Sequence, residues 1–216
     1  MGFIASIMDI LFPPRCVFCR RPIRSGEPDM CPTCRGSLPV LEGDDAETRG
    51  EYFEVCYSPL RFEGSVRSAV QRFTFKNAVS YADCFGALLA DCIRANLSGR
   101  YDIISWVPLS EERLRTRGYD QAFLLAQAAA LSLDDIAVEL LVRHTDAKAQ
   151  ATLKDQSERQ ENVRGVFAVA DPELPAGKRV LLIDDVVTSG ATLSECARTL
   201  LEAGAQSVVC AALAKT

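Results

Sequence analysis

Two adjacent carboxylates interrupt an apolar run in the stretch VLLIDDVVTSGAT at 180–192. Val180 to Ile183 predict a short strand that is apolar on both faces, as in a parallel sheet covered on each side. Asp184 and Asp185 follow this strand directly. Ligands of open α/β sheets bind beyond the carboxyl ends of the strands, so we expect both aspartates at that edge, above the core.

The turn from Val187 to Thr192 follows the aspartates, is rich in hydroxyl groups and leads into a predicted helix. Backbone N–H groups at a helix N-terminus attract phosphate, and the helix dipole adds to that attraction. Gly190 lets the backbone approach a ligand closely because it has no Cβ. The turn matches neither the P-loop nor the GxGxxG pattern. Paired acids beside a phosphate site suit a sugar phosphate whose hydroxyls, or a bound Mg²⁺, face the acids.

Four cysteines near the front of the chain form two CxxC pairs, Cys16 with Cys19 and Cys31 with Cys34. Such pairs on tight turns place four thiolates at the corners of a tetrahedron, which is the structural zinc site of ribbons and knuckles. The segment is rich in proline and glycine and cannot build an apolar core, so it needs a cross-link such as a bound Zn²⁺. The alternatives are two disulfides or four unrelated cysteines. Four thiolates leave no open position for catalysis.

Composition indicates a soluble globular protein, with 48% apolar and 25% charged residues in a chain of 216. The net charge of −5 argues against a bulk electrostatic grip on nucleic acid, although a local basic patch stays open. No apolar run is long enough to cross a bilayer, and the first twelve residues are a poor secretory signal. We expect a cytoplasmic protein without stable membrane insertion. Residues 1–12 fit an amphipathic helix that docks on the protein itself or, alternatively, contacts a membrane.

Periodicity divides the chain into a helix and four-cysteine module at 1–40, a linker at 41–51 and a large domain at 52–216. Within the large domain, alternating or continuous apolar residues predict strands around Val55 and at 103–107, 136–142, 165–170, 180–183 and 207–213. Apolar stripes predict helices at 85–93, 121–131 and 193–201. A strand–loop–helix–strand order is a βαβ unit, so the large domain should be α/β with a mainly parallel sheet.

The polar stretch from Thr145 to Asn162 is too long for an ordinary connection. An active-site flap and a solvated surface loop are both open interpretations. His144 is the only histidine, and we expect it to be a structural or loop residue rather than part of a Ser-His-Asp triad. The five cysteines outside the CxxC pairs lie in apolar surroundings and are expected in the core: Cys56, Cys84, Cys92, Cys196 and Cys210.

The stretch at 180–192 resembles the PRPP-binding motif of type I phosphoribosyltransferases: an apolar strand, Asp-Asp, two apolar residues and Thr-Ser-Gly-Ala-Thr. The chain as a whole resembles the ComF family of competence-associated proteins, which join a four-cysteine zinc motif to a phosphoribosyltransferase-like domain. The resemblance also rests on PPRCVFC, CPTC, VPLSEERLRTRGYDQAFLLA and RQENVRGVF. Ser189 stands where many relatives have threonine, and the change keeps the hydroxyl.

The resemblance implies roles for individual residues. Asp184 and Asp185 would bind the ribose hydroxyls, directly or through Mg²⁺. The 5′-phosphate would lie in the turn made of Val187, Thr188, Ser189, Gly190, Ala191 and Thr192. A pyrophosphate loop would follow the strand at Trp106, with Pro108, Leu109, Ser110, Arg113, Arg115 and Arg117. For the three arginines, a solvated helix face is the alternative. A mobile flap would span 148–164 and add Arg159 and Arg164.

Two functions remain open at this point. The first is binding of PRPP with Mg²⁺, with displacement at the anomeric carbon by an unknown nitrogen acceptor; whether the chain turns over is undecided. The second is a non-catalytic accessory protein of natural transformation that senses PRPP or binds single-stranded DNA. Phe73 and Phe75 near basic residues could stack bases. A helicase-type competence partner and a role in DNA uptake are implied by the family alone.

Overall fold

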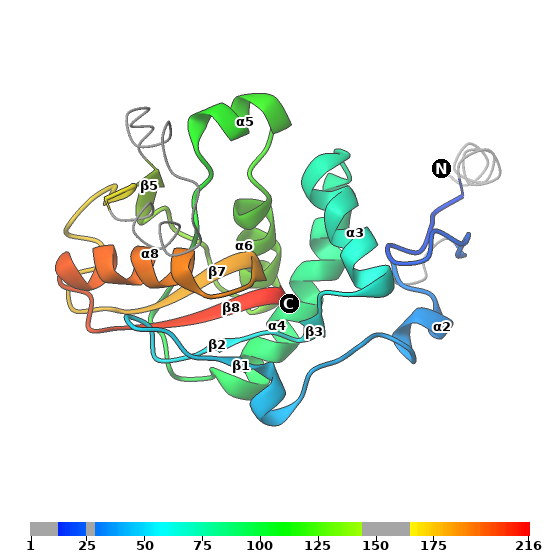
Figure 1. Ribbon diagram of the computed structural model, residues 1–216, viewed down its shortest axis with the longest axis horizontal. Coiled ribbons are helices and arrows are strands. Elements are labelled where there is room, and N and C mark those ends of the chain that lie inside the picture. The colour runs from blue at the N-terminus through cyan, green and yellow to red at the C-terminus, as the bar shows by residue number, and fades with distance from the viewer. Residues whose placement is uncertain (1–12, 25–28, 144–164) are drawn as a thin grey trace, which may run out of the picture.

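A six-stranded sheet forms the centre of the computed structural model, which describes residues 13–24, 29–143 and 165–216 (Figure 1). The strands run in the order β1-β2-β8-β7-β4, and β3 pairs with β8 beyond the end of β2. All pairs are parallel except β1 with β2. The bounds are β1 (Glu47–Thr48), β2 (Cys56–Tyr57), β3 (Leu60–Arg61), β4 (Ile103–Trp106), β7 (Arg179–Val187) and β8 (Ser207–Lys215). The expected α/β fold with a mainly parallel sheet is confirmed.

Six α-helices and two 3₁₀ turns accompany this sheet in the described part of the chain. The helices are α2 (Pro32–Arg35), α3 (Gly64–Phe75), α4 (Ala82–Asn96), α5 (Glu111–Arg117), α6 (Gln121–Ser132) and α8 (Ala191–Glu202), and the 3₁₀ turns are η1 (Gly43–Ala46) and η2 (Val79–Tyr81). A two-stranded antiparallel sheet, β5 (Leu141–Arg143) with β6 (Phe167–Val169), lies beside α8. No helix among the described residues is long and apolar enough to cross a membrane.

Alternate residues of β7 pack into two separate cores. Leu181 and Ile183 face a core that they share with α3, α4, α6 and the cysteine module. Val180 and Leu182 face a core that they share with α8 and the β5–β6 pair. The strand is therefore covered on both faces, as its continuous apolar run predicts. Within the first core α4 and α6 pack so closely that a Cβ added at Gly86 would lie only 2.4 Å from the Cβ of Ala128.

The strand at 180–183 was predicted to end before the aspartates, and this prediction is wrong. β7 continues to Val187, because β8 pairs with it as far as Lys215. The helices predicted at 85–93 and 121–131 are confirmed as parts of α4 and α6. α3 has no counterpart among the predicted elements.

The segment at 41–51, which we expected to be a linker, contains η1 and β1, and β1 pairs with β2 at the edge of the main sheet. The cysteines outside the CxxC pairs also divide. Cys56, Cys196 and Cys210 are buried in the core as expected, whereas Cys84 and Cys92 on α4 are only half-buried.

Candidate functional site

The carboxyl end of β7 projects beyond its neighbour β4. The last β4–β7 pair joins Trp106 to Ile183, whereas the β7–β8 ladder continues to Val187. One side of β7 therefore lacks a strand partner from Asp184 onward, and both Asp184 and Asp185 are half-buried there. The aspartates lie at the carboxyl edge of the parallel sheet, where ligands of such sheets bind.

The two aspartates form a half-buried pair of like charges. An oxygen of Asp184 accepts the Asp185 backbone N–H at 2.8 Å, and the Thr74 hydroxyl donates to Asp185 Oδ2 at 3.2 Å. Burial, and then the charge of Asp185, hold the pKa of Asp184 well above its usual range. Burial also raises the pKa of Asp185, and the Thr74 hydroxyl offsets part of that rise. Such a pair favours a cation or hydroxyl donors beside it, so these residues fit Mg²⁺ or a ribose.

The turn after β7 presents backbone N–H groups at the start of α8. Gly190 caps the helix with φ 75°, and its carbonyl accepts the first helical hydrogen bond from Ser194 at 2.8 Å. Thr188 and Ser189 are exposed. Within the described residues, the N–H groups of Thr188, Ser189 and Thr192 have no hydrogen-bond acceptor. The turn is thus open to an anion rather than packed into the interior.

The loop after β4, expected to be the pyrophosphate loop, is tied to α6 by Asp120. This carboxylate accepts the N–H of Leu109 at 3.0 Å and the N–H of Phe123 at 3.1 Å, so it caps α6 and holds the loop at once. Ser110 in turn caps α5, because its hydroxyl accepts the Arg113 N–H at 3.4 Å. Pro108 is buried, and Leu109 and Ser110 are half-buried.

The three arginines of α5 have different surroundings. Arg117 stacks over the Phe75 ring at 4.8 Å and donates to Gln121 Oε1 at 3.0 Å, and its charge offsets part of the rise that burial causes in the pKa values of Asp185 and Asp120. Arg115 is 81% exposed and forms an ion pair with Glu111 at 3.1 Å. The structure therefore brings Arg117 towards the aspartates and leaves Arg115 on a solvated face.

A further arginine, Arg143, lies at this edge and was missed in the sequence. It ends β5, pairs with Phe167 on β6, and holds its guanidinium 5.3 Å from the Phe167 ring. Burial lowers the pKa of Arg143, the charge of Arg113 lowers it further, and Asp184 is among the acidic groups that oppose the change. No carboxylate or carbonyl within the described residues accepts a hydrogen bond from its guanidinium. Two neighbouring cations favour an anionic ligand beside them.

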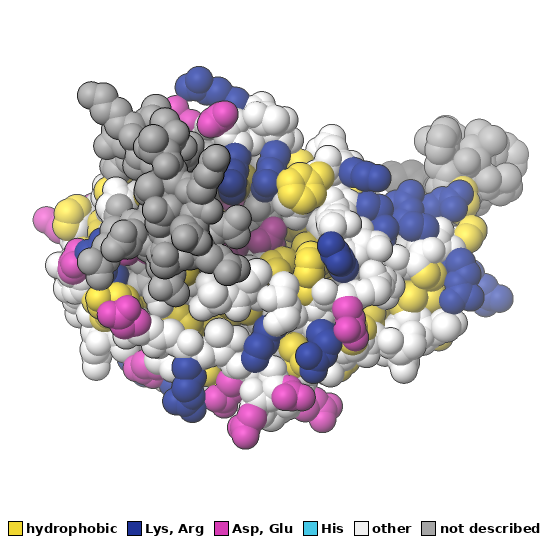
Figure 2. Space-filling model, in the orientation of Figure 1, with side chains coloured by type: hydrophobic (Ala, Val, Ile, Leu, Met, Phe, Trp, Pro, Cys, Tyr) yellow, Lys and Arg dark blue, Asp and Glu magenta, His cyan; other side chains and the backbone are white. Residues whose placement is uncertain are grey.

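Charge position in the sequence could have revealed Arg143, because it follows the predicted strand at 136–142 directly, as the aspartates follow theirs. Thr74 gave no comparable signal. Figure 2 shows acidic side chains set back between α5 and α3, with Lys and Arg side chains around them. This view agrees with the contacts described above, in which the acidic side chains of the site have cationic side chains near them.

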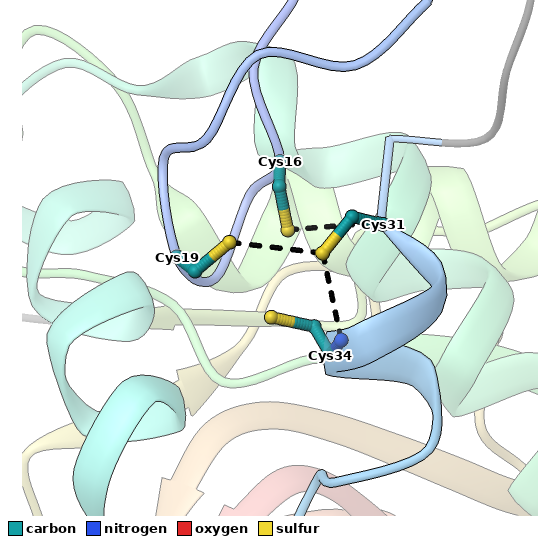
Figure 3. A group of neighbouring side chains, drawn as sticks. All are labelled: Cys16, Cys19, Cys31 and Cys34. Atoms are coloured by element: carbon teal, nitrogen blue, oxygen red, sulfur yellow. Dashed lines mark hydrogen bonds between the residues drawn. The ribbon is translucent and has the colours of Figure 1, made fainter.

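The four cysteines of the CxxC pairs lie together, and their sulfur atoms are all within 4.8 Å of one another (Figure 3). The turn at 16–19, which we call the knuckle, faces Cys31 and Cys34 at the start of α2. All nine cysteines are free thiols, so the alternative of two disulfides is wrong. The Arg21 backbone N–H and then its side chain lower the pKa of Cys19 to about 6, which favours the thiolate that a metal binds. This donor set fits a structural Zn²⁺.

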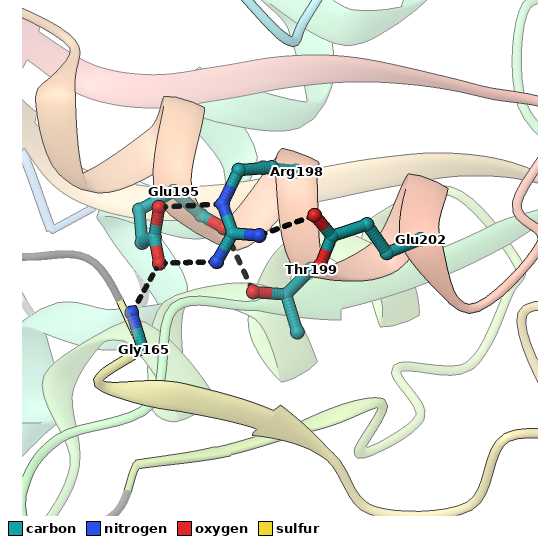
Figure 4. A network of polar contacts seen from close by, with 5 residues as sticks. All are labelled: Gly165, Glu195, Arg198, Thr199 and Glu202. Atoms are coloured by element: carbon teal, nitrogen blue, oxygen red, sulfur yellow. Dashed lines mark hydrogen bonds and ion pairs between the residues drawn. The ribbon is translucent and has the colours of Figure 1, made fainter.

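A buried carboxylate fixes the described residues that follow the 144–164 segment. Glu195 on α8 accepts the Gly165 N–H at 2.7 Å and forms an ion pair with Arg198 at 2.7 Å, and Arg198 also bonds Glu202 (Figure 4). β5 and β6 flank this segment in the sequence and are paired, so the described residues Arg143 and Phe167 on either side of it lie opposite each other. The proposed flap at 148–164, with Arg159 and Arg164, lies outside the described residues, as do His144 and the expected helix at 1–12.

Comparisons with known proteins match two domains in this chain. The family model of the phosphoribosyl transferase domain matches residues 120–216, and that of the double zinc ribbon domain matches residues 7–47. Competence protein F of Haemophilus influenzae is 28% identical over 90% of this chain and 93% of its own length. The chain thus joins a double zinc ribbon domain to a phosphoribosyl transferase domain, and its similarity to Competence protein F is consistent with the ComF family.

Other relatives match this chain over a smaller part of its length. Competence protein ComFC of Bacillus subtilis is 28% identical over 68% of this chain and 58% of its own length. The DNA utilization protein YhgH of Escherichia coli K12 is 34% identical over 53% of this chain and 50% of its own length. Among solved structures, glutamine PRPP amidotransferase from B. subtilis matches with a TM-score of 0.47 and 19% identity, over 66% of this chain and 30% of that one.

The two domain matches confirm two predictions, the phosphoribosyltransferase-type α/β domain and the cysteine ribbon in front of it. The roles of the individual residues at the sheet edge remain predictions, which the contacts above make specific.

Proposed function

We propose that this chain binds PRPP together with Mg²⁺ at the carboxyl edge of β7. The observation that carries the proposal is the half-buried aspartate pair directly beside an open turn of backbone N–H groups. Only Val186 and Val187 separate the aspartates from the first of these N–H groups, so one ligand can meet both features. A ligand with a phosphate on one side and hydroxyls on the other is a sugar phosphate.

Each part of the ligand has a partner in this arrangement. The turn from Val187 to Thr192 binds the 5′-phosphate, and Asp184 and Asp185 bind the ribose hydroxyls or hold Mg²⁺. Mg²⁺, when bound, neutralises the carboxylates and part of the diphosphate charge. Arg143 with Arg113 supplies cations for the diphosphate.

If the chain also transfers the phosphoribosyl group, its residues act by position and charge. The bond from the anomeric carbon to the diphosphate oxygen breaks, the electron pair leaves with pyrophosphate, and a nitrogen acceptor forms the new bond. Arginines that stabilise the departing diphosphate lower the barrier without any protein nucleophile.

Calorimetric titration of the zinc-loaded chain with PRPP and Mg²⁺ tests the proposal. Wild type should release heat of binding, and Asp184→Asn/Asp185→Asn should release none, because the ribose and metal partners are lost. The chain offers a matched control in Asp134→Asn/Asp135→Asn, an Asp-Asp pair that precedes the bridge at Ala137 and so lies at the amino edge of the sheet. Equal binding by wild type and the 184/185 variant would refute the assignment.

Turnover is a separate question, which release of pyrophosphate from PRPP decides. The zinc-loaded chain is incubated with Mg²⁺, PRPP and a panel of bases and amines. Release that depends on one acceptor, and that the 184/185 variant lacks, identifies an enzyme. Binding without release under every acceptor supports a PRPP sensor.

Binding of single-stranded DNA is the second candidate function, favoured by one observation. The Phe75 ring is 67% exposed at the end of α3 with Arg117 stacked on it, which is the combination that stacks bases. Phe73, the other candidate, is fully buried and cannot stack a base, so that part of the sequence interpretation is wrong. The affinity for a labelled oligonucleotide, measured by fluorescence anisotropy, should fall in Phe75→Ala. It should not fall in Ile136→Ala, which changes a similarly exposed apolar residue elsewhere. Equal anisotropy for both variants would remove this candidate.

A further inference from the structure

Helix α3 is bonded to the cysteine knuckle through Arg72. The Arg72 Nη2 donates to the carbonyl oxygens of Val17 at 2.7 Å and Phe18 at 2.9 Å. Its Nε donates to the Tyr81 hydroxyl at 3.3 Å, which also accepts a hydrogen bond from Arg20 at 2.7 Å. A guanidinium holds several acceptors in one fixed plane. Arg72 therefore anchors the last turn of α3 to the backbone of the knuckle.

Aromatic packing reinforces the same connection. The Phe85 ring on α4 lies 5.9 Å from Phe18 of the knuckle and 5.4 Å from Phe73 on α3, measured between ring centroids. Tyr81 packs on Phe85 as well, at 5.9 Å. The contacts are tilted or edge-on, which are the favourable arrangements of aromatic pairs. Knuckle and helix thus share one apolar cluster.

Two residues after Arg72, Thr74 contacts the candidate ligand site. Its buried hydroxyl is the donor to Asp185 Oδ2 described above. Residues two positions apart in an α-helix project about 200° from each other, so Arg72 and Thr74 leave α3 on opposite sides. Arg72 points to the knuckle, and Thr74 points to the carboxylate. Among the described residues, α3 is the only helix whose side chains donate hydrogen bonds to both sites.

We propose that Thr74 is a positioning residue for Asp185, and that the zinc-loaded knuckle fixes Thr74 in place through Arg72. The ribbon then has a role in ligand binding although it lies outside the ligand site. Coupling between two sites is reciprocal in binding free energy, so ligand should also tighten the retention of zinc. This inference rests on the proposed function, because the affinity for PRPP reports the orientation of Asp185.

Two pairs of variants of the full zinc-loaded chain test the inference by titration with PRPP and Mg²⁺. Thr74→Val keeps the shape of the side chain and removes the donor, so affinity should fall about tenfold, the effect of losing one hydrogen bond to a charged group. Thr74→Ser keeps the donor and should restore wild-type affinity, which a purely packing role would not explain. Equal affinity of Thr74→Val and wild type would overturn the positioning role.

The second pair compares two arginines of α3. Arg72→Met removes the bonds to the knuckle, and Arg67→Met makes the same change at an exposed position that only stacks on Phe62. PRPP affinity should fall about fivefold in Arg72→Met and stay unchanged in Arg67→Met, since coupling energies start near that size. In a competition with a chelator, PRPP should protect zinc in wild type and not in Arg72→Met. Equal behaviour of the two arginine variants would overturn the link.

A readout without ligand separates failure of this inference from failure of the proposed function. Hydrogen exchange of the last turn of α3 should be faster in Arg72→Met than in Arg67→Met, because that turn loses its anchor. If wild type binds no PRPP, the proposed function fails and the exchange difference alone decides the anchoring. If PRPP binds and neither pair of variants differs, the inference fails and the proposed function stands.

Discussion

The cysteine ribbon and the end of β7 each bring groups that carry like charges close together, thiolates in the first and carboxylates in the second. The two regions differ in how the repulsion between these groups is offset. In the ribbon, four sulfur atoms within 4.8 Å of one another are arranged around one point, and backbone N–H groups at 3.4 and 3.5 Å already contact two of them. At the end of β7, two carboxylates share one hydroxyl donor and one N–H, and β4 no longer covers that side of the strand.

The difference indicates two kinds of site. A closed set of four thiolates has no place for an exchangeable ligand, so its cation is a permanent part of the fold. The electrostatic repulsion within a pair of carboxylates on an open edge persists until a ligand binds. Such a ligand can therefore bind and dissociate. The first region fits a structural role, and the second is where we propose that the ligand binds.

The largest expected effect comes from removing the permanent cation. Cys16→Ser/Cys31→Ser should lower the metal content from about one zinc per chain to none, because two of four ligands are lost. Residues 13–40 should then lose protection from hydrogen exchange, whereas the core between β7 and α8 keeps it. The matched variant Cys84→Ser/Cys92→Ser changes two half-buried cysteines and should keep its zinc. Metal content that is unchanged in the first variant would contradict a closed site.

A smaller effect is expected for the cation beside the open site. Arg143→Met should weaken binding of PRPP about tenfold, the range expected for a lost charge-assisted hydrogen bond. Ribose 5-phosphate lacks the diphosphate and should bind both proteins equally. Arg115→Met removes a solvated arginine and serves as the control in the same titration. A parallel loss of affinity for both ligands would place Arg143 outside the diphosphate site.

The smallest effect is on stability. The pKa of Asp184 is raised in the folded chain, so its protonated form stabilises the fold below the unfolded pKa, and this contribution is lost as pH rises through the folded pKa. Asp184→Asn mimics the protonated form. At neutral pH the ligand-free variant should melt about 2–4 °C above wild type, as for about 1 kcal/mol in a chain of this size.

Melting curves of both proteins at about pH 4 and at neutral pH check this expectation, because the difference should shrink in acid. Asp134→Asn provides a control at an exposed position. A variant that melts below wild type at neutral pH would show that the carboxylates are not in conflict in the free protein.

Local features of this chain could be predicted and contacts between distant residues could not. The four cysteines lie within one short segment, so their spacing alone fixes the cluster. The stripes of α4 and α6 follow the helical period and predict their buried faces. Thr74 and Asp185 are 111 residues apart, and no periodicity relates a buried threonine in an unpredicted helix to a carboxylate on a strand.

The end of β7 shows a second limit of the sequence. Paired acids normally mark the end of an apolar strand, so the prediction stopped at Ile183. The strand continues because β8 supplies a partner on one side, while β4 ends on the other. Hydrogen bonding to a neighbour, rather than the polarity of its own residues, decides where this strand ends.

A crystal structure of the zinc-loaded chain with PRPP and Mg²⁺ tests the central claim most directly. We expect the 5′-phosphate within hydrogen-bonding distance of the N–H groups from Thr188 to Thr192 and the ribose hydroxyls or the metal at Asp184 and Asp185. A complex in which the phosphate lies elsewhere and those N–H groups meet only solvent would contradict the account.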